Sequence, residues 1–348
     1  MKLKVTILSM LMITCLFGIT ALAAEKKEQS QMNIEEKEVY DGVKNYVYEV
    51  YPNLNLEEKL ILIDELYEEK SPSSTYNKRN EKLDTNDEVD VNEEVDEAYA
   101  RMMEEEIYIV NLINDSGQEA SIVSWEENLN YLKSNYEKIM NIDNVNIRNV
   151  DSYIEAYEWV LKLKDMPEEK ISNKKTIQPR ATYDYASAVS YAQKYYSSYN
   201  SNYPDWSYYG DCANFISQCL YAGGKTMKGT PGTQTAAENW ANWFSKGTSL
   251  DTKNVSSTWR GADAFRGFWQ ENATSYKKFT AVDSTSYSYG YRGDAVSLLN
   301  SNGRAYHTLI IVEYSYPDFT IGAHTGNTIT AKLSSKVDSN GFYIYNMR

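Results

Sequence analysis

The sequence predicts an α+β protein, with a mostly helical first half followed by a helix and an antiparallel sheet. Apolar residues recur at helical spacing in two blocks before residue 165, whereas apolar runs alternate with turn pairs after residue 294. The charge also divides the chain. From Ala181 onward there are 12 acidic and 14 basic residues, whereas the first 180 residues hold 37 acidic and 21 basic ones. This change indicates a domain boundary near residue 180.

The chain begins with a pattern typical of an export signal. Lys2 and Lys4 precede an apolar run over residues 5–19, and Ala21-Leu22-Ala23 offers a small-residue cleavage site. The run is shorter than the roughly 20 residues that a membrane span needs. We therefore predict a signal peptide over residues 1–23 and a mature protein without an integral membrane span. The mature protein is expected to be secreted and extracellular, or associated with the cell wall.

Residues 24–170 predict an acidic, mostly helical region, with helices within residues 33–69 and 96–164. An apolar stripe marks the second block, formed by Trp125, Leu129, Leu132, Tyr136 and Ile139. Residues near 70–94 are too polar to bury a core, so we expect a disordered linker there. A second, basic linker is predicted over residues 171–182. The charge pattern gives no reason to expect nucleic acid as a partner.

Residues 183–348 are predicted to form a second domain that contains a helix and a sheet. Asp211 is a good N-cap for a helix that starts at Cys212 and ends at Gly223-Gly224. Asn302-Gly303 predicts a hairpin between strands at 295–299 and 305–314. Pro317-Asp318 predicts a turn before a strand at 320–324, and a last strand is expected at 342–345. The pattern is an antiparallel meander with a helix ahead of it.

Only two cysteines, Cys212 and Cys219, follow the predicted cleavage site. Seven residues of helix rise about 10.5 Å, which exceeds the roughly 7 Å limit for a disulfide. Both thiols are therefore expected to stay free. Cys212 would lie in the first turn of its helix, where the helix dipole and unpaired N–H groups favour a thiolate. Cys219 would lie two turns deeper on the apolar face, as an inert core residue.

A thiolate nucleophile needs a base, and the base needs a third group that orients it. The mature chain has two histidines, His307 and His324. If the turn spans residues 315–318, Leu309 lies opposite His324, which puts both histidines on one sheet face about 7 Å apart. The same register puts Asn327 on the other face, which favours His324 as the orienting group. We predict Cys212 as nucleophile, His307 as base and His324 as orienting residue.

These cysteine and histidine side chains could also have structural or metal-binding roles. A single cysteine on a helix is most often a core residue, and a single histidine on a strand is most often a bonded structural residue; their combination favours catalysis. Structural zinc sites use close ligand pairs, whereas six residues separate Cys212 from Cys219. We therefore expect neither a metal nor an organic cofactor.

Several strings in the second half resemble one known family. They are Tyr203-Pro204-Asp205, the run GDCANFISQCLYAGG over residues 210–224, Trp240, Trp243, Gly293-Asp294, His307 and Ala323-His324-Thr325. Residues 183–346 resemble the putative amidase domain family, which is similar to the NlpC-type and CHAP-type papain-like peptidases of bacterial cell walls. The resemblance implies a papain-like cysteine peptidase core, a helix packed on an antiparallel sheet, with Cys212, His307 and His324 as its site. It implies amide hydrolysis through a thioester on Cys212.

Two departures from the family pattern leave the substrate open. The segment between Asp294 and His307 is shorter than is common, and Thr308 stands where a small apolar residue is frequent. We expect peptidoglycan or a peptide as substrate. The alternative is a catalytically silent, secreted cell-wall binding module with the same fold. Lys174-Lys175 and Arg180 would suit processing of a pro-segment, and a plain linker between the two halves is the other interpretation.

Overall fold

The computed structural model describes residues 32–71, 92–164 and 183–348. The chain divides into two compact units, and all described residues from Asn92 onward belong to the second. The predicted signal peptide over residues 1–23 lies outside the described residues, as do most of the predicted linker near 70–94 and all of the linker at 171–182.

The first unit contains helices α2 (Ile34–Val50) and α3 (Leu56–Lys70). A capping box starts α3, because the Asn55 side chain accepts from the Glu58 backbone N–H while the Glu58 carboxylate accepts from that of Asn55. Tyr40 on α2 meets Tyr67 on α3 edge to face, with ring centres 5.4 Å apart. These two helices confirm the helical prediction for residues 33–69.

The second unit combines helices with one sheet, which confirms the predicted α+β class. Its helices are α5 (Asn92–Asp115), α6 (Trp125–Met140), α7 (Ile147–Lys164), α8 (Tyr185–Tyr195), α9 (Cys212–Ala222), α10 (Gln234–Glu238), α11 (Ser257–Arg260), α12 (Ala262–Asn272) and α13 (Ser284–Tyr289). Its strands are β1 (Ser275–Phe279), β2 (Ala295–Leu299), β3 (Ala305–Ser315), β4 (Asp318–Ala323), β5 (Thr328–Lys332) and β6 (Phe342–Asn346).

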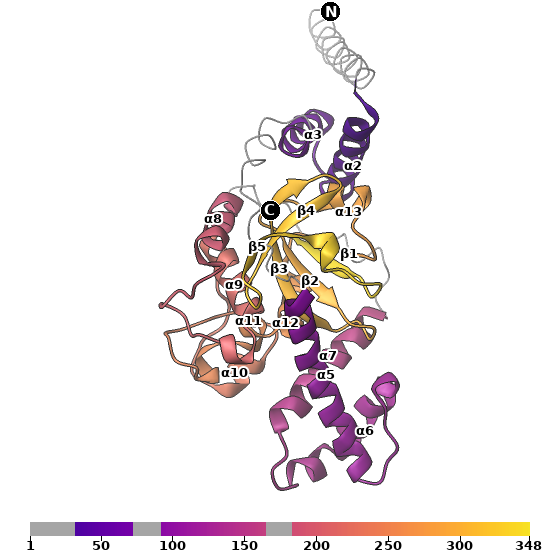
Figure 1. The fold of residues 1–348 in the computed structure, drawn as a ribbon, viewed down its shortest axis with the longest axis vertical. Helices are drawn as coiled ribbons and strands as arrows, with labels where there is room; N and C mark the ends of the chain where they lie inside the picture. Colours follow the sequence, from indigo (N-terminus) through magenta and orange to yellow (C-terminus); the bar gives the residue numbers. More distant parts are fainter. Residues whose placement is uncertain (1–31, 72–91, 165–182) are drawn as a thin grey trace, which may run out of the picture. The chain divides into compact units, whose positions relative to one another are not determined.

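The sheet is antiparallel throughout, in the order β1-β6-β2-β3-β4-β5 (Figure 1). Strands β2 to β4 follow the predicted meander, but the last predicted strand, β6, crosses back to pair with β2 and β1, and the unpredicted β5 pairs with β4. The sequence pattern missed β1 and β5, which are the two edge strands. Each has five residues and carries lysine, Lys277 and Lys278 in β1 and Lys332 in β5. Short, charged edge strands resist pairing with other chains and lack an apolar run.

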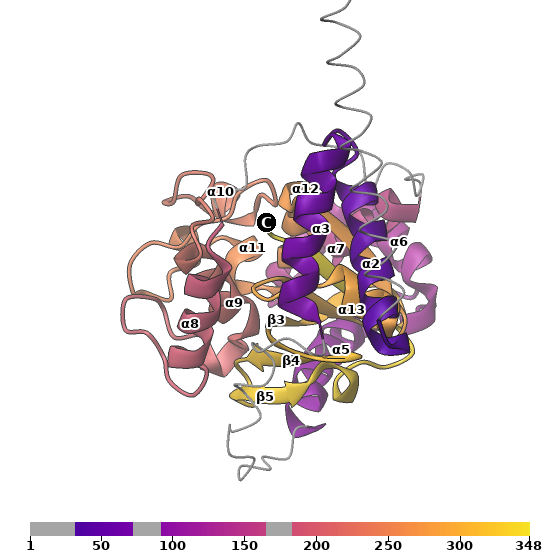
Figure 2. The same ribbon diagram turned by 90° about the horizontal axis from the view of Figure 1, so that it is seen from above.

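Helix α9 lies on one face of the sheet, where Ala213 and Ile216 share a buried core with Ala295 and Ile310 of the sheet. Helices α8 and α12 contribute to the same core, and α8 to α11 gather on this side (Figure 2). The predicted ends of α9 are confirmed, since it starts at Cys212 and its first residue beyond the end is Gly223.

Helices α5, α6 and α7 form a bundle at one end of the sheet (Figure 1). On α6, the predicted stripe is confirmed as the side that packs into the core of this bundle, with Leu129 and Leu132 almost fully buried. Trp125 of α6 stacks on Tyr157 of α7, with ring centres 4.8 Å apart. Two residues further along α7, the Trp159 indole N–H donates to Gln270 of α12 at 2.6 Å. This bond ties the bundle to a helix that packs on the sheet.

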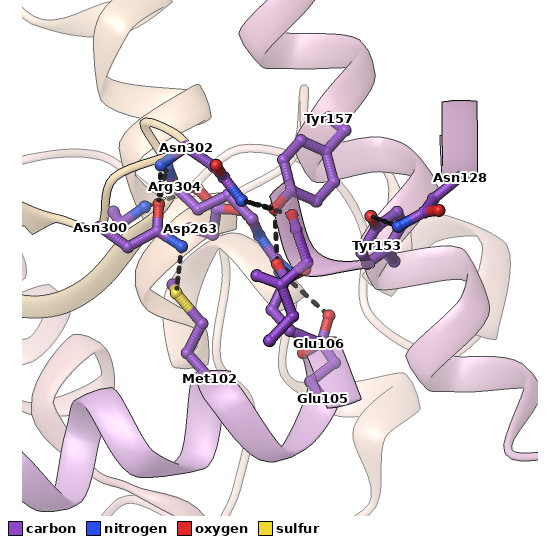
Figure 3. Close-up of polar contacts among 12 residues, drawn as sticks. Met102, Glu105, Glu106, Asn128, Tyr153, Tyr157, Asp263, Asn300, Asn302 and Arg304 are labelled. Carbon is purple, nitrogen blue, oxygen red and sulfur yellow. Dashed lines mark hydrogen bonds and ion pairs between the residues drawn. The ribbon is translucent and has the colours of Figure 1, made fainter. Parts of the chain in front are cut away.

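A buried arginine joins the bundle to the start of strand β3 (Figure 3). The Arg304 guanidinium bonds Glu106 at 2.8 Å and Glu105 at 3.0 Å, both on α5, and Asp263 of α12 at 3.0 Å. Burial opposes its charge, but these carboxylates together raise the pKa of Arg304 well above its ordinary value. Tyr157 donates to Glu106 at 2.6 Å, which adds α7 to the network.

We expect Arg304→Ala to lower the free energy of unfolding by about 3–5 kcal/mol, because it leaves buried carboxylates without their counter-charge. Urea denaturation of the full chain measures the change. Lys164→Ala is the matched control, since its ion pair with Glu126 is about half exposed and should be worth less than about 1 kcal/mol. Equal losses in the two variants would contradict a structural role for the network.

Candidate active site

Cys212 is the first residue of α9 and lies at the wall of a cavity. Its side chain is 7% exposed and carries a free thiol. The second free thiol, Cys219, is fully buried, and burial raises its pKa well above the ordinary value. The two cysteines therefore differ as expected, with Cys212 next to open space and Cys219 held as a neutral thiol in the core.

The cavity beside Cys212, called here the Cys212 cavity, has a volume of about 750 Å³. Such a volume suits a small ligand or a short peptide. One wall belongs to residues 183–348, called here the sheet domain, and includes Gly210, Cys212 and Thr325. Helices α5 and α7 form another wall, which includes Arg101 and Glu155. Helices from the acidic first half of the chain thus face the cysteine, which no pattern in the sequence predicted.

Gly210 shapes the approach to α9. Its backbone has φ +93° and ψ 117°, a conformation that residues with a Cβ rarely adopt. The guanidinium of Arg101 lies over this glycine, with Cζ and Nε 3.6 Å from the place where a Cβ would be. An arginine of α5 therefore lies next to the backbone that leads into Cys212.

Asp211 is the N-cap residue of α9, which confirms the predicted position, but its side chain makes no capping hydrogen bond. Its carboxylate instead accepts from the Trp206 backbone N–H at 3.2 Å and from the Asn214 amide at 2.8 Å. The other carboxylate oxygen lies 2.6 Å from Nδ1 of His324. Asp211 is almost fully buried. Its contacts join the loop that contains Trp206, helix α9 and the residue that follows β4.

His324 makes close contacts through both ring nitrogens and through one face of its ring. Its Nε2 lies 2.7 Å from the Tyr195 carbonyl oxygen, and its ring stacks on Phe215 with centres 3.9 Å apart. Both ring nitrogens thus lie next to oxygen atoms, one of Asp211 and one of Tyr195. His324 was predicted to orient His307. It instead contacts Asp211, the residue that precedes Cys212.

The register of β3 and β4 changes within the hairpin. Tyr314 pairs with Phe319, which confirms the register predicted from the turn. A β-bulge beyond Ile311 then shifts the pairing by one residue, so that Ile310 faces Gly322. A one-residue shift moves every later side chain to the other face of the sheet.

The predicted shared face of the two histidines is therefore wrong. His307 pairs with Leu298, three residues before Ile310, and Ile310 packs on the α9 side. Strand alternation assigns His307 to the opposite face, whereas His324 contacts Asp211 on the α9 side. His307 is fully buried, and of the described residues neither histidine lines the Cys212 cavity.

Comparison with known proteins gives one family match, in the second half of the chain. Residues 182–345 match the family described as "Putative amidase domain". This match supports a hydrolase that acts on amides. The matched segment includes Cys212, His307 and His324, whereas Arg101 and Glu155 of the cavity wall precede it.

A curated relative, "Uncharacterized protein YhbB" of Bacillus subtilis (strain 168), is 31% identical over 131 residues. The alignment covers 37% of this chain and 37% of that protein, so the chain spans little more than a third of the relative's length. No solved structure matches the chain.

The described ranges contain neither a cluster of metal-ligating side chains nor a helix suited to cross a membrane. Within residues 32–71, 92–164 and 183–348, His, Cys, Asp and Glu side chains do not gather in threes that could hold a metal ion. In the same ranges no helix has the length and apolar character to cross a membrane.

Carboxyl groups gather at the far part of the Cys212 cavity, where two neighbouring hollows share Glu155 and Glu238 with it. Burial first, and then the charges of Glu238 and Asp151, raise the pKa of Glu155 to about 7. Asp151 accepts from the Tyr136 hydroxyl at 2.6 Å. The cavity wall therefore carries a carboxyl group that titrates near neutral pH.

We expect Asp211→Asn to destabilise the full chain by about 1–3 kcal/mol, because an amide cannot keep all the contacts that this buried carboxylate makes with Trp206, Asn214 and His324. In a double-mutant cycle with His324→Gln, the double variant should lose less than the sum of the single losses, by about 1–3 kcal/mol. Thermal unfolding measures both. Asp205→Asn, on the exposed loop nearby, is the control, and additive losses at Asp211 and His324 would contradict the pairing.

We expect Glu155→Gln to raise the free energy of unfolding by about 1–2 kcal/mol at pH 8 and to leave it unchanged at pH 4. The raised pKa means that the folded chain prefers the protonated carboxyl, so its stability falls as the pH rises from about 4.5 through 7. The magnitude is reduced for partial exposure. Urea denaturation at both pH values decides it, with the exposed Glu137→Gln as control; a loss at pH 8 would refute the assignment.

Proposed function

We propose that the protein is an exported, cysteine-dependent amide hydrolase that cuts an amide bond of bacterial cell-wall peptidoglycan. The observation that carries the proposal is the position of Cys212. This residue starts α9, faces a cavity and lies within the segment that matches the amidase family. Export rests on the predicted signal peptide over residues 1–23. The cell-wall substrate rests on the resemblance of residues 183–346 to papain-like wall peptidases.

The chemistry follows from a thiolate at a helix N-terminus. The Cys212 sulfur attacks the carbonyl carbon, and the backbone N–H groups of the first turn of α9 stabilise the oxyanion. A histidine protonates the leaving amine as the C–N bond breaks and the thioester forms. Water then attacks the thioester, with the histidine as base, and the C–O bond replaces the C–S bond. Neither a metal nor an organic cofactor takes part.

His307 and His324 are proposed for different roles. His307 is the proposed base, an assignment that comes from the family resemblance. His324 is the proposed positioning residue, because its bond to Asp211 holds the residue before the nucleophile. Strand alternation turns His307 away from α9, which makes the role of His307 the most informative one to test.

We expect Cys212→Ala to abolish release of fragments from purified sacculi by the full chain lacking residues 1–23, while Cys219→Ala keeps more than about half of the activity. Cys212 lies at the helix N-terminus beside the cavity, whereas burial raises the pKa of Cys219 well above its ordinary value. Mass spectrometry of the released fragments measures activity and identifies the bond that is cut. Iodoacetamide should label Cys212 and spare Cys219 in the native protein.

The two histidines are separated by the pH dependence of that labelling. Loss of the base removes the thiolate–imidazolium form, so His307→Gln should shift the labelling of Cys212 to higher pH and abolish turnover. His324→Gln should lower activity together with stability. The opposite pattern, with the labelling shift in His324→Gln alone, would make His324 the base.

A catalytically silent wall-binding module is the second candidate, and it is favoured by the absence of both histidines from the described lining of the Cys212 cavity. It predicts that the chain sediments with sacculi but releases no fragments, and that Cys212→Ala binds equally well. Release of fragments that depends on Cys212 excludes this candidate.

A further inference from the structure

Helices α5 and α7 supply one wall of the Cys212 cavity although they precede the family match at residue 182. From α5 comes Arg101, and from α7 comes Arg148. The wall is fixed, because Arg304 binds α5 through Glu105 and Glu106 (Figure 3). A binding residue on such an anchored helix is presented in a defined position.

Two further contacts fix α5 at the level of the cavity. The Asn300 amide donates to the sulfur of Met102 at 3.0 Å (Figure 3), and Met102 follows Arg101 in the chain. One turn before Met102, Tyr99 meets Tyr306 of β3 edge to face, with ring centres 5.4 Å apart. Arg101 therefore lies between two contacts that bind α5 to the strand hairpin.

Arg101 lies close to the nucleophile. Its Cζ and Nε atoms lie 3.6 Å from the place where a Cβ on Gly210 would be, two residues before Cys212, and all three residues line the cavity. The side chain is partly exposed, although its Nη2 atom is buried. The guanidinium carries a permanent positive charge, so it attracts a carboxylate that enters the cavity.

Both basic and acidic side chains line the Cys212 cavity. Arg148 and Arg260 also line it, and after burial the charge of Arg148 contributes to lowering the pKa of Arg260 to about 10. An anion would relieve the repulsion between these two arginines. The carboxyl groups of Asp151, Glu155 and Glu238 lie where the cavity meets the two neighbouring hollows, which exclude Arg101. Further carboxylates that line the cavity are Glu104, Glu105 and Asp263, and the last two bond Arg304.

We propose that α5 and α7 complete the substrate site and that Arg101 binds a carboxylate of the substrate beside Cys212. This rests on the proposed function. The substrate class is then a peptide that carries a free carboxylate, from its C-terminus or an acidic side chain, within one or two residues of the bond that is cut. Arg101 is a specificity-determining residue that takes no part in proton transfer.

The test compares two forms of one substrate with the full chain lacking residues 1–23. The probes are stem peptides isolated from sacculi, either native or with their carboxylates converted to amides. Arg101→Gln should raise KM for the native peptides by about tenfold to a hundredfold, the range of a charge-assisted hydrogen bond, and leave kcat and iodoacetamide labelling of Cys212 unchanged. For the amidated peptides, wild type and Arg101→Gln should have the same KM.

Arg101→Lys should recover part of the loss, because it keeps the positive charge but changes the position and geometry of the donor. Lys138→Gln, an exposed residue on α6, removes the same charge away from the cavity and should change nothing. A higher activity of Arg101→Gln would instead show that α5 blocks the site, and equal effects on both peptides would show a structural role. Either result overturns the proposal.

Binding separates failure of this inference from failure of the proposed function. Calorimetry with the Cys212→Ala chain measures affinity for both peptides without turnover. If sacculi are never cut, the hydrolase proposal fails, yet tighter binding of the native peptide that is lost in Cys212→Ala/Arg101→Gln would still support the carboxylate site. Equal binding of native and amidated peptides by Cys212→Ala would overturn it.

Discussion

The arrangement around the cysteine depends on one buried guanidinium. Arg304 lies at the start of β3 and bonds carboxylates from α5 and α12, so it joins the helical bundle to the sheet domain. A buried charge of this kind is a poor source of stability when compared with apolar packing, but it tolerates few alternatives in geometry. Because α5 is held there, its next turn toward the N-terminus reaches the Cys212 cavity.

A second buried ion pair organises the other side of the cavity. Asp211 and His324 join the loop before α9 to the end of β4, and Phe215 stacks on the same imidazole. Such a pair fixes the entry of the chain into α9, which determines where the thiol of Cys212 points. The two ion pairs thus position opposite walls, one formed by the matched amidase segment and one formed by helices that lie outside it.

Periodicity and turn chemistry predicted most of the secondary structure, because they depend on neighbours in sequence. The ends of α9 and the hairpin at Asn302-Gly303 follow from local rules. The bulge beyond Ile311 does not, since a single extra residue leaves the apolar pattern of β3 readable in either register. The prediction that both histidines share a face failed for that reason, although its first pairs near the turn were right.

The roles of charged residues were harder to predict than the elements that carry them. Asp211 had the position of an N-cap, and only the fold shows that its carboxylate serves His324 instead. Glu105 and Glu106 looked like two more acids in an acidic helix, yet both bind the arginine that starts β3. An acidic composition describes a solvated surface well, but it does not distinguish the few carboxylates whose partners are distant in sequence. Those few decide that the helices of the first half belong to the cavity that contains Cys212.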